Sequence, residues 1–371
     1  SPWPPTSQQH LSRAIIASMR AIVVLTTALL ARAQQFAGEA EERAYNEYAH
    51  FIRQELGLLE PERQIQRRLQ SDLDVCQLKG DSSLCPIADM PEYTSTLVAS
   101  GGDTRCLLDD SAPYQFQVVP GARKDKLLLY FQGGGACWTE LSTRVPLCLT
   151  DIVPEIPLKG VLNNSEPINP YADYTVVMVL YCSGDVYTGD VVRDYTVRGS
   201  SVVQIGQRNT QSVLDWVVAQ QRNGGLSSTL EDLVILGDSA GSIGVQLWAA
   251  RIGAALSWKS TVVVPDAYLA VFPDSIGQVI RDFGACGFFE SEALQKDCYE
   301  GVITVEDIAL DTIKRTGPTV PFLYTSAKSD LLQIGLYAAL VLSGGERLTN
   351  IVTKEEWYRL GDELLLRFED L

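Results

Sequence analysis

Short apolar runs alternate along this chain with longer segments whose apolar residues recur at helical spacing. The apolar runs are bounded by polar residues or glycines, as buried strands are, and lie at residues 126–131, 174–181, 233–236, 261–264 and 321–325. Helical spacing marks residues 205–220, 240 to about 252, and 331–342. Strands that alternate with helices predict an α/β protein whose mostly parallel sheet is covered by helices on both faces.

The N-terminal 75 residues have a different character. Met19 and Arg20 precede an apolar stretch of signal-peptide length, which ends in Ala-Arg-Ala at residue 33. We interpret 19–33 as a secretory signal and 1–18 as translated upstream sequence, the alternative being a longer extension with an internal apolar helix. Residues 34–75 are charged, with apolar residues at helical spacing, and predict a helical extension ahead of a main domain at 76–371. His50 in this extension is interpreted as a solvated helix residue.

The charge and the cysteines limit the partners and cofactors. A net charge of −16 over 371 residues repels nucleic acid and anionic membranes, so neither is an expected partner. An even number of cysteines behind a secretory signal predicts disulfides, with Cys137–Cys148 and Cys286–Cys298 as the first pairs to consider. The absence of C-x-x-C and the scarcity of histidine argue against zinc, and no metal or cofactor is expected. Asn163 begins an N-x-S glycosylation sequon.

The strongest chemical signal is Gly237-Asp238-Ser239-Ala240-Gly241, which lies between the apolar run 233–236 and a helical segment. In this strand–turn–helix setting, G-x-S-x-G is typical of a nucleophile elbow, which exposes the serine hydroxyl above the sheet. The glycines leave out side chains that would collide with the neighbouring strand and helix. We therefore predict Ser239 as a nucleophile, the alternative being a structural glycine-rich turn.

A second signal, Gly133-Gly134-Gly135, follows the apolar run 126–131. An esterase needs backbone N–H donors aimed at the oxygen that becomes negative in the tetrahedral intermediate. A glycine run after an early strand suits this role, and the residue after the nucleophile, Ala240, normally supplies another donor. By itself the glycine run is an ordinary turn, and only its order relative to the elbow favours an oxyanion hole.

Together, GGGACW, YCSGDVYTGD, VLDWV and GDSAG resemble the pectin acetylesterase/Notum family, over roughly residues 76–371. The resemblance implies a secreted serine esterase of the α/β-hydrolase fold that needs no cofactor. It implies Ser239 as nucleophile, with Gly134, Gly135 and Ala240 as oxyanion donors and Trp138 beside the pocket. The expected substrate is an acylated polysaccharide such as pectin, losing acetyl groups, or another extracellular ester. A Notum-like lipid-acyl substrate is the alternative.

The acid of the catalytic triad should lie on a loop after a later strand. The family pattern D-x-x-Q places it at Asp330, with Gln333 three residues on, although Asp266 also qualifies by position. An aspartate that caps a helix is the structural alternative for Asp330. Asp185, Asp190 and Asp194 form another acidic group, which we interpret as loop caps rather than a cation site.

A histidine late in the chain normally serves as the base in this fold. The two histidines here, His10 and His50, both lie upstream of the elbow. We therefore expect a fold that lacks its C-terminal strand and histidine loop, with about 30 further residues carrying them, a strand of usual length and its loop. The amphipathic pattern at 354–371 stops without a breaker, which favours the same interpretation. The alternative is an inactive hydrolase-fold protein with a binding or assembly role.

Overall fold

The computed structural model describes residues 72–108, 113–145, 147–267, 271–327 and 330–343, with Arg359 and Asp362. These residues belong to the larger of two compact units, which comprises residues 51–371. The expected signal segment, the extension as far as residue 71, both histidines and most of the segment 350–371 lie outside the described residues. The boundary expected at 75/76 falls inside strand β1 (Asp74–Gln77), which pairs with its neighbour in the sheet.

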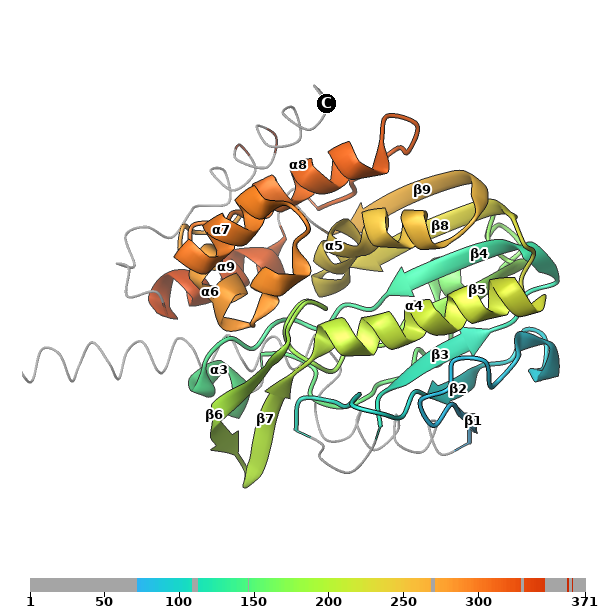
Figure 1. Ribbon diagram of the computed structural model, residues 1–371, viewed down its shortest axis with the longest axis horizontal. Helices are drawn as coiled ribbons and strands as arrows, with labels where there is room; N and C mark the ends of the chain where they lie inside the picture. Colours follow the sequence, from blue (N-terminus) through green and yellow to red (C-terminus); the bar gives the residue numbers. More distant parts are fainter. Residues whose placement is uncertain are drawn as a thin grey trace, which may run out of the picture. The chain divides into compact units, whose positions relative to one another are not determined.

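The described chain contains a seven-stranded sheet in the order β1-β2-β3-β5-β4-β8-β9 (Figure 1). Its parallel half confirms the predicted runs: β4 (Arg123–Phe131), β5 (Tyr174–Val179), β8 (Leu230–Asp238) and β9 (Trp258–Asp266). The pattern did not foresee β2 (Thr96–Ala99) and β3 (Gln115–Val119), which make antiparallel pairings that turn the sheet into a mixed one. The sheet is nevertheless mostly parallel, and the predicted fold class is confirmed.

The predicted strand at 321–325 is shorter than expected. It makes only isolated parallel bridges to β9, from Phe322 to Val263 and from Thr325 to Asp266. These bridges place the segment beside β9 and carry its end toward the carboxyl edge of the sheet.

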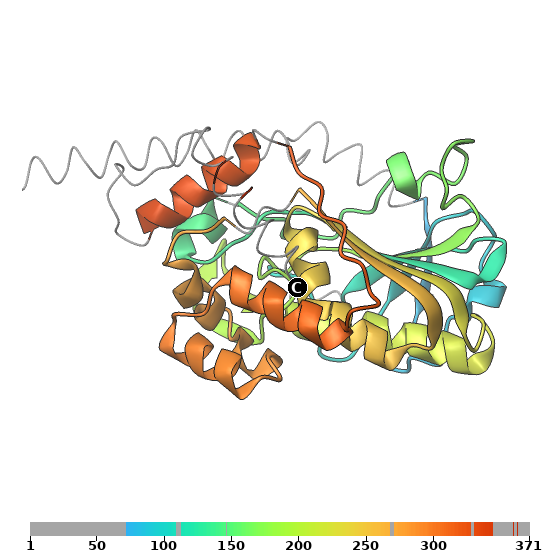
Figure 2. The same ribbon diagram turned by 90° about the horizontal axis from the view of Figure 1, so that it is seen from above.

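The predicted helices form as α4 (Gly206–Asn223), α5 (Ala240–Ala255) and α9 (Leu331–Ser343). Short additional elements were not predicted: the helices α3 (Glu140–Arg144), α6 (Ile276–Asp282), α7 (Glu292–Glu300) and α8 (Val305–Thr316), the hairpin β6 (Val191–Val197) and β7 (Ser200–Gln204), and the 3-10 turns η1 (Ile87–Asp89), η2 (Gly160–Leu162) and η3 (Ala285–Phe288). Figures 1 and 2 show α6, α7 and α9 grouped beyond the end of the sheet toward which β4 points.

Alternation along the parallel strands builds the core. Leu128 and Tyr130 of β4 share one cluster with Val176 and Met178 of β5 and with residues of β8 at the same spacing, since every second side chain of a strand lies on one face. Trp216 of α4 packs against Phe116 of β3, with ring centroids 5.1 Å apart. Both side chains are fully buried, and they attach α4 to the sheet.

All eight cysteines are paired. Cys137–Cys148 and Cys286–Cys298 confirm the two predicted bridges, and Cys76–Cys85 and Cys106–Cys182 complete the set. Four disulfides fit an oxidising compartment. In the part of the chain that the structure describes, every helix is too short or too polar to cross a membrane.

Candidate active site

The sharp turn between β8 and α5 places Ser239 where the G-x-S-x-G pattern predicted it. Ser239 has φ 51° and ψ −118°, a conformation that non-glycine residues rarely adopt and that is held only by surrounding structure. A Cβ on Gly237 would lie 2.3 Å from the carbonyl oxygen of Gly241, and a Cβ on Gly241 would lie 2.0 Å from that of Phe131. Both glycines are therefore required by the tight packing of the turn, as the sequence indicated.

The glycine loop after β4 is bonded directly to this turn. Gly133 N–H donates to Asp238 Oδ1 over 3.0 Å, and the Tyr130 hydroxyl donates to the same oxygen over 2.6 Å. Asp238 is the residue immediately before Ser239. One carboxylate thus joins the predicted nucleophile to the predicted oxyanion loop.

Backbone contacts leave two N–H groups of the loop available. Ala136 N–H donates to the Leu147 carbonyl, and the Gly134 carbonyl accepts from Leu149 N–H. Among the described residues, the N–H groups of Gly134 and Gly135 have no acceptor. Two adjacent unbonded donors beside the serine turn are what an oxyanion hole requires.

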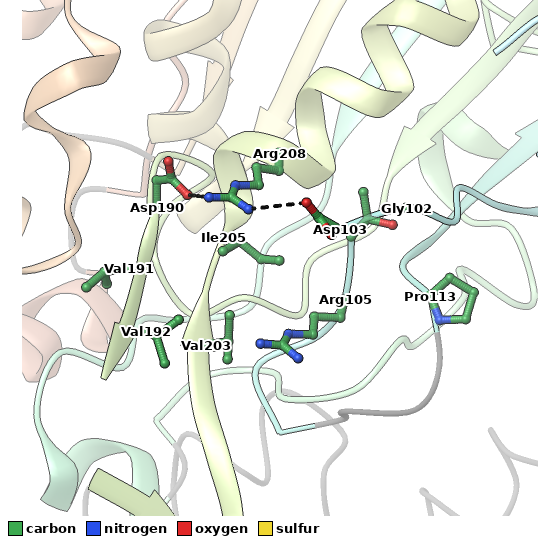
Figure 3. A pocket seen from close by; sticks show the side chains of 11 residues that line it. Gly102, Asp103, Arg105, Pro113, Asp190, Val191, Val192, Val203, Ile205 and Arg208 are labelled. Atoms are coloured by element: carbon green, nitrogen blue, oxygen red, sulfur yellow. Dashed lines mark ion pairs between the residues drawn. The ribbon is translucent and has the colours of Figure 1, made fainter. Parts of the chain in front are cut away.

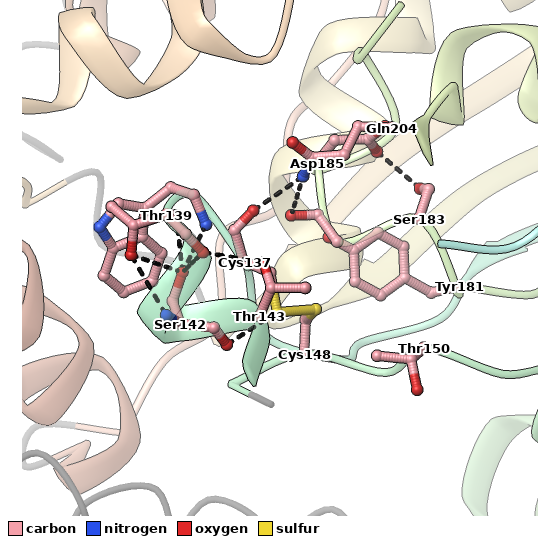
Figure 4. The surroundings of a disulfide bond; sticks show 12 residues. Cys137, Thr139, Ser142, Thr143, Cys148, Thr150, Tyr181, Ser183, Asp185 and Gln204 are labelled. Carbon is pink, nitrogen blue, oxygen red and sulfur yellow. Dashed lines mark hydrogen bonds between the residues drawn. A yellow bond between two sulfur atoms is a disulfide. The ribbon is translucent and has the colours of Figure 1, made fainter. Parts of the chain in front are cut away.

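Close packing around two glycines and a disulfide fix the shape of this loop. Gly135 has φ 70°, and a Cβ there would lie 2.1 Å from the Leu147 carbonyl oxygen. A Cβ on Gly134 would lie 2.4 Å from the Tyr181 ring. The Cys137–Cys148 bridge closes this loop immediately downstream (Figure 4).

The YCSGDVYTGD segment and the end of β7 each donate a hydrogen bond to the glycine loop, which sequence reasoning did not foresee. The Tyr187 hydroxyl donates to the Gln132 carbonyl, and Gln204 Nε2 donates to the Cys137 carbonyl over 2.7 Å. Asp185 is fully buried and accepts a bond from Ser183 Oγ (Figure 4). It also accepts bonds from the N–H groups of Tyr187 and Gly206. Its bond to Gly206, at the start of α4, matches the predicted loop-cap role. Burial raises the pKa of the Asp185 carboxyl.

The two candidate triad acids lie at the same edge of the sheet. Asp330 Oδ1 accepts the N–H groups of Leu332 and Gln333 at 3.0 Å each, so this carboxylate caps the start of α9. Gln333 Nε2 donates both to Asp330 Oδ2 and to the Ala267 carbonyl at the end of β9. The Gln of D-x-x-Q therefore connects Asp330 to the strand end beside the elbow.

Asp266 occupies that strand end. Its carbonyl accepts the N–H of Ser239 over 3.1 Å, and its side chain, which is exposed, accepts from the Thr325 hydroxyl. Both aspartates thus remain compatible with a triad by position. The described residues include no histidine.

Two further carboxyl groups near the elbow have altered proton affinity. Burial raises the pKa of Asp238, an effect that its bonds from Tyr130 and Gly133 oppose. Burial also raises the pKa of Glu155, which accepts a 2.7 Å bond from Gln132 Nε2 and is repelled by Asp238. The negative potential around these groups raises the pKa of the Tyr130 hydroxyl beyond the effect of burial.

A small apolar pocket of about 40 Å³ adjoins the glycine loop. Its lining comes from the loop, α5, α6 and α9, and includes Ala136, Trp138, Ile243, Phe272, Phe283 and Leu336. Trp138 is only 4% exposed, and its N–H donates to Ser142 Oγ. Trp138, the predicted pocket residue, therefore lines this cavity. Sequence reasoning did not predict the lining residues from α6 and α9, because these helices are distant from Trp138 in the sequence.

Other predicted residues lie away from this centre. Asn163 ends η2 in a surface loop, where its side-chain oxygen accepts from Ser165 N–H. Asp190 pairs with Arg208. Among the described residues, no group of three or more His, Cys, Asp or Glu side chains is placed to hold a metal ion.

The sheet, the serine turn and the glycine loop define an α/β-hydrolase-like protein. The sequence profile of the pectinacetylesterase family matches residues 90–278, about half of the chain, and the chain therefore belongs to this family. It is 28% identical over 142 residues to the palmitoleoyl-protein carboxylesterase Notum of Schmidtea mediterranea. That match covers 36% of this chain and 25% of the relative, so it spans about a quarter of the relative's length.

The fold agrees with this assignment. A crystal structure of the Wnt deacylase Notum from Drosophila superposes with a TM-score of 0.50 at 19% identity, covering 72% of this chain and 80% of that one. At this identity the likeness concerns the fold.

Proposed function

We propose that this protein is a secreted serine carboxylesterase that removes acetyl groups from a polysaccharide such as pectin. The observation that carries the proposal is the hydrogen bond from Gly133 N–H to the Asp238 carboxylate. This bond holds the strained Ser239 turn next to the glycine loop, which has two unbonded N–H groups. The family name supports an acetyl ester of pectin as substrate. The four disulfides support secretion.

The chemistry proceeds through an acyl-enzyme. Ser239 Oγ bonds to the acyl carbon while a base takes its proton, and the carbonyl oxygen becomes negative. The N–H groups of Gly134, Gly135 and Ala240 stabilise that oxygen. The proton then passes to the sugar oxygen as the ester bond breaks, and water releases acetate by the reverse steps.

Asp330 is the proposed acid that orients the base, with Gln333 fixing its carboxylate relative to the end of β9. Asp266 remains the alternative, since its backbone is bonded to Ser239 itself. The base that takes the Ser239 proton is the remaining member of the proposed triad, and the described residues include no histidine. A chain without any such group would instead keep the site for binding.

The size of the apolar pocket favours a short acyl group. Its volume of about 40 Å³ is a few times the minimum that one water needs, about 10–15 Å³, which suits the methyl end of an acetyl group. A long acyl chain would require α6 and α9 to move apart. The Notum relative favours the opposite alternative, a lipid-acyl substrate.

Rates on p-nitrophenyl acetate and p-nitrophenyl octanoate separate these alternatives. For the natural protein, we expect a higher kcat/KM on the acetate than on the octanoate. Substituting Ile243→Ala should widen the pocket and shift the ratio toward octanoate, whereas the exposed Val302→Ala serves as a control. Faster octanoate turnover by the unmodified protein would reject the acetyl proposal.

A further inference from the structure

Arg193 of β6 contacts two walls of the apolar pocket that adjoins the glycine loop. Its Nη2 donates a long hydrogen bond, of 3.4 Å, to the Trp138 carbonyl. Its guanidinium carbon lies 5.9 Å from the ring centroid of Phe283, within the range of a cation–π contact. Trp138 belongs to the loop, Phe283 ends α6, and both side chains line the pocket. One arginine therefore connects two pocket walls that are far apart in the sequence.

Arg193 also reaches the glycine loop through Gln204 at the end of β7. Arg193 Nε donates to Gln204 Oε1 over 2.6 Å. Gln204 Nε2 donates to the Cys137 carbonyl over 2.7 Å (Figure 4) and to the Gly184 carbonyl over 3.3 Å. A guanidinium has only donors, so it stabilises one orientation of the Gln204 amide, with the oxygen toward Arg193. The amide N–H groups are thereby directed at the loop.

The β6–β7 hairpin is held in place by contacts that do not involve Arg193. Asp190, directly before β6, pairs with Arg208 of α4 at 2.8 Å (Figure 3). The Asp190 N–H donates to the Phe283 carbonyl over 3.0 Å. β6 is also paired with β7 at both of its ends. A substitution at Arg193 should therefore change the contacts of this side chain and leave the hairpin in position.

The partners of the Arg193 guanidinium are neutral. They are a side-chain amide, a peptide carbonyl and an aromatic ring. In the part of the chain that the structure describes, no carboxylate forms an ion pair with this group. Hydrogen bonds from a charged donor are stronger than those between neutral groups. The guanidinium therefore orients Gln204 and the Trp138 carbonyl rather than neutralising a nearby acid.

We propose that Arg193 is a positioning residue that sets the acyl-chain preference of the site, a role that rests on the proposed esterase function. By holding the Trp138 carbonyl and, through Gln204, the Cys137 carbonyl, it fixes the loop that carries the two unbonded N–H groups. By its contact with Phe283 it keeps the facing wall of the pocket close to the loop. Loss of the guanidinium misaligns the oxyanion donors and lets the pocket accept longer acyl groups.

Rates on p-nitrophenyl acetate and p-nitrophenyl octanoate test the proposal in Arg193→Gln. We expect kcat on the acetate to fall about tenfold or more, because small misalignments cost large factors in rate. The acetate-to-octanoate ratio of kcat/KM should fall about fivefold or more, because a wider apolar pocket discriminates less between acyl groups. This ratio does not depend on the fraction of protein that is folded, so a merely structural role would leave it unchanged.

Arg198→Gln is the matched control, because it removes the same charge from the exposed turn of the same hairpin. Both rates and their ratio should equal those of the natural protein. Arg193→Lys keeps the charge but lacks the planar fork that reaches two acceptors, and its ratio should lie between the natural protein and Arg193→Gln.

Gln204→Glu decides the matter if thermal melting shows that Arg193→Gln folds poorly. The new carboxylate still accepts from Arg193 Nε, but it places an oxygen where the Cys137 carbonyl needs a donor. We therefore expect the same fall in kcat on the acetate although the contact with Arg193 remains. A kcat equal to that of the natural protein would overturn the proposed relay.

Hydrogen exchange of the loop peptide separates this role from the esterase function, because it needs no turnover. We expect faster exchange of the Ala136, Cys137 and Trp138 amides in Arg193→Gln, and natural rates in the Arg198 control. Faster exchange together with a natural protein that shows no turnover would reject the esterase and keep the positioning role. Turnover with an unchanged acyl-chain ratio or unchanged exchange in Arg193→Gln would reject the proposal and keep the esterase.

Discussion

Tyr130 and Asp238 are joined by a 2.6 Å hydrogen bond from the phenol to the carboxylate, across two adjacent parallel strands. Asp238 precedes the proposed nucleophile, and Tyr130 lies just ahead of the glycine loop, whose Gly133 N–H shares the same oxygen. The bond therefore fixes the distance between the attacking group and the donors that stabilise the intermediate. Small errors in such an alignment cost large factors in rate.

Tyr130→Phe should lower kcat on p-nitrophenyl acetate by about tenfold or more while KM changes little, because the affected donors act mainly in the transition state. Loss of the bond should also reduce the free energy of unfolding by about 1–3 kcal/mol. Tyr174→Phe is the matched control, since Tyr174 of β5 donates to Asp232 near the start of β8 over 3.2 Å, away from the Ser239 turn. Equal kinetic effects of the two substitutions would contradict a positioning role for Tyr130.

We expect the Cys137–Cys148 disulfide to affect kcat, whereas the Cys76–Cys85 disulfide should affect only the free energy of unfolding. Replacing both cysteines with alanine should cost about 3 kcal/mol of unfolding free energy, and removing Cys76–Cys85 should cost about the same, since both close short loops. Only the first change loosens the glycine loop and should lower kcat. Chemical denaturation and p-nitrophenyl acetate kinetics on both double variants provide the comparison, and equal kcat values would refute the prediction.

Glu155 predicts a specific pH dependence of stability. The pKa of Glu155 is raised in the folded protein, chiefly by burial. The contribution of Glu155 to the free energy of unfolding is therefore fully present below its pKa in the unfolded chain, and it is lost as the pH rises through its pKa in the folded protein. Glu155→Gln keeps the acceptor for Gln132 but removes the charge near Asp238. The variant should therefore be more stable than the natural protein at neutral pH, with the difference vanishing toward pH 4.5.

Urea denaturation between pH 4 and 8 measures this difference, with the exposed Glu166→Gln as control. A variant that is less stable at neutral pH, or a difference that grows on acidification, would show that Glu155 contributes through its charge.

Local signals explain which parts of the fold and site were predictable. The elbow is encoded within five residues, and the bridge between Cys286 and Cys298 spans a separation of only 12. The Cys106–Cys182 bridge spans 76 residues, and the pairing of β3 and β4 with β5 lies between its two partners in the sequence. The spacing of cysteines along the sequence does not predict a disulfide between residues so far apart.

The remaining surprises have the same origin. The far wall of the apolar pocket comes from α6 and α9, whose apolar residues read as ordinary core positions in the sequence. The antiparallel strands β2 and β3 are short, and only pairing with β5 extends the sheet through them. The run at 321–325 has the composition of a strand but bridges β9 only at Phe322 and Thr325.

Reaction of the natural protein with a fluorophosphonate probe tests the central claim most directly, because the probe modifies only an activated serine. We predict labelling on the peptide that contains Ser239, complete loss of labelling in Ser239→Ala, and full labelling in Ser257→Ala, an exposed serine at the opposite end of the strands. Loss of a triad member typically lowers kcat by about 10⁴-fold or more, so turnover should disappear together with the label. Labelling that survives Ser239→Ala, or a folded natural protein with neither label nor turnover, would contradict the account.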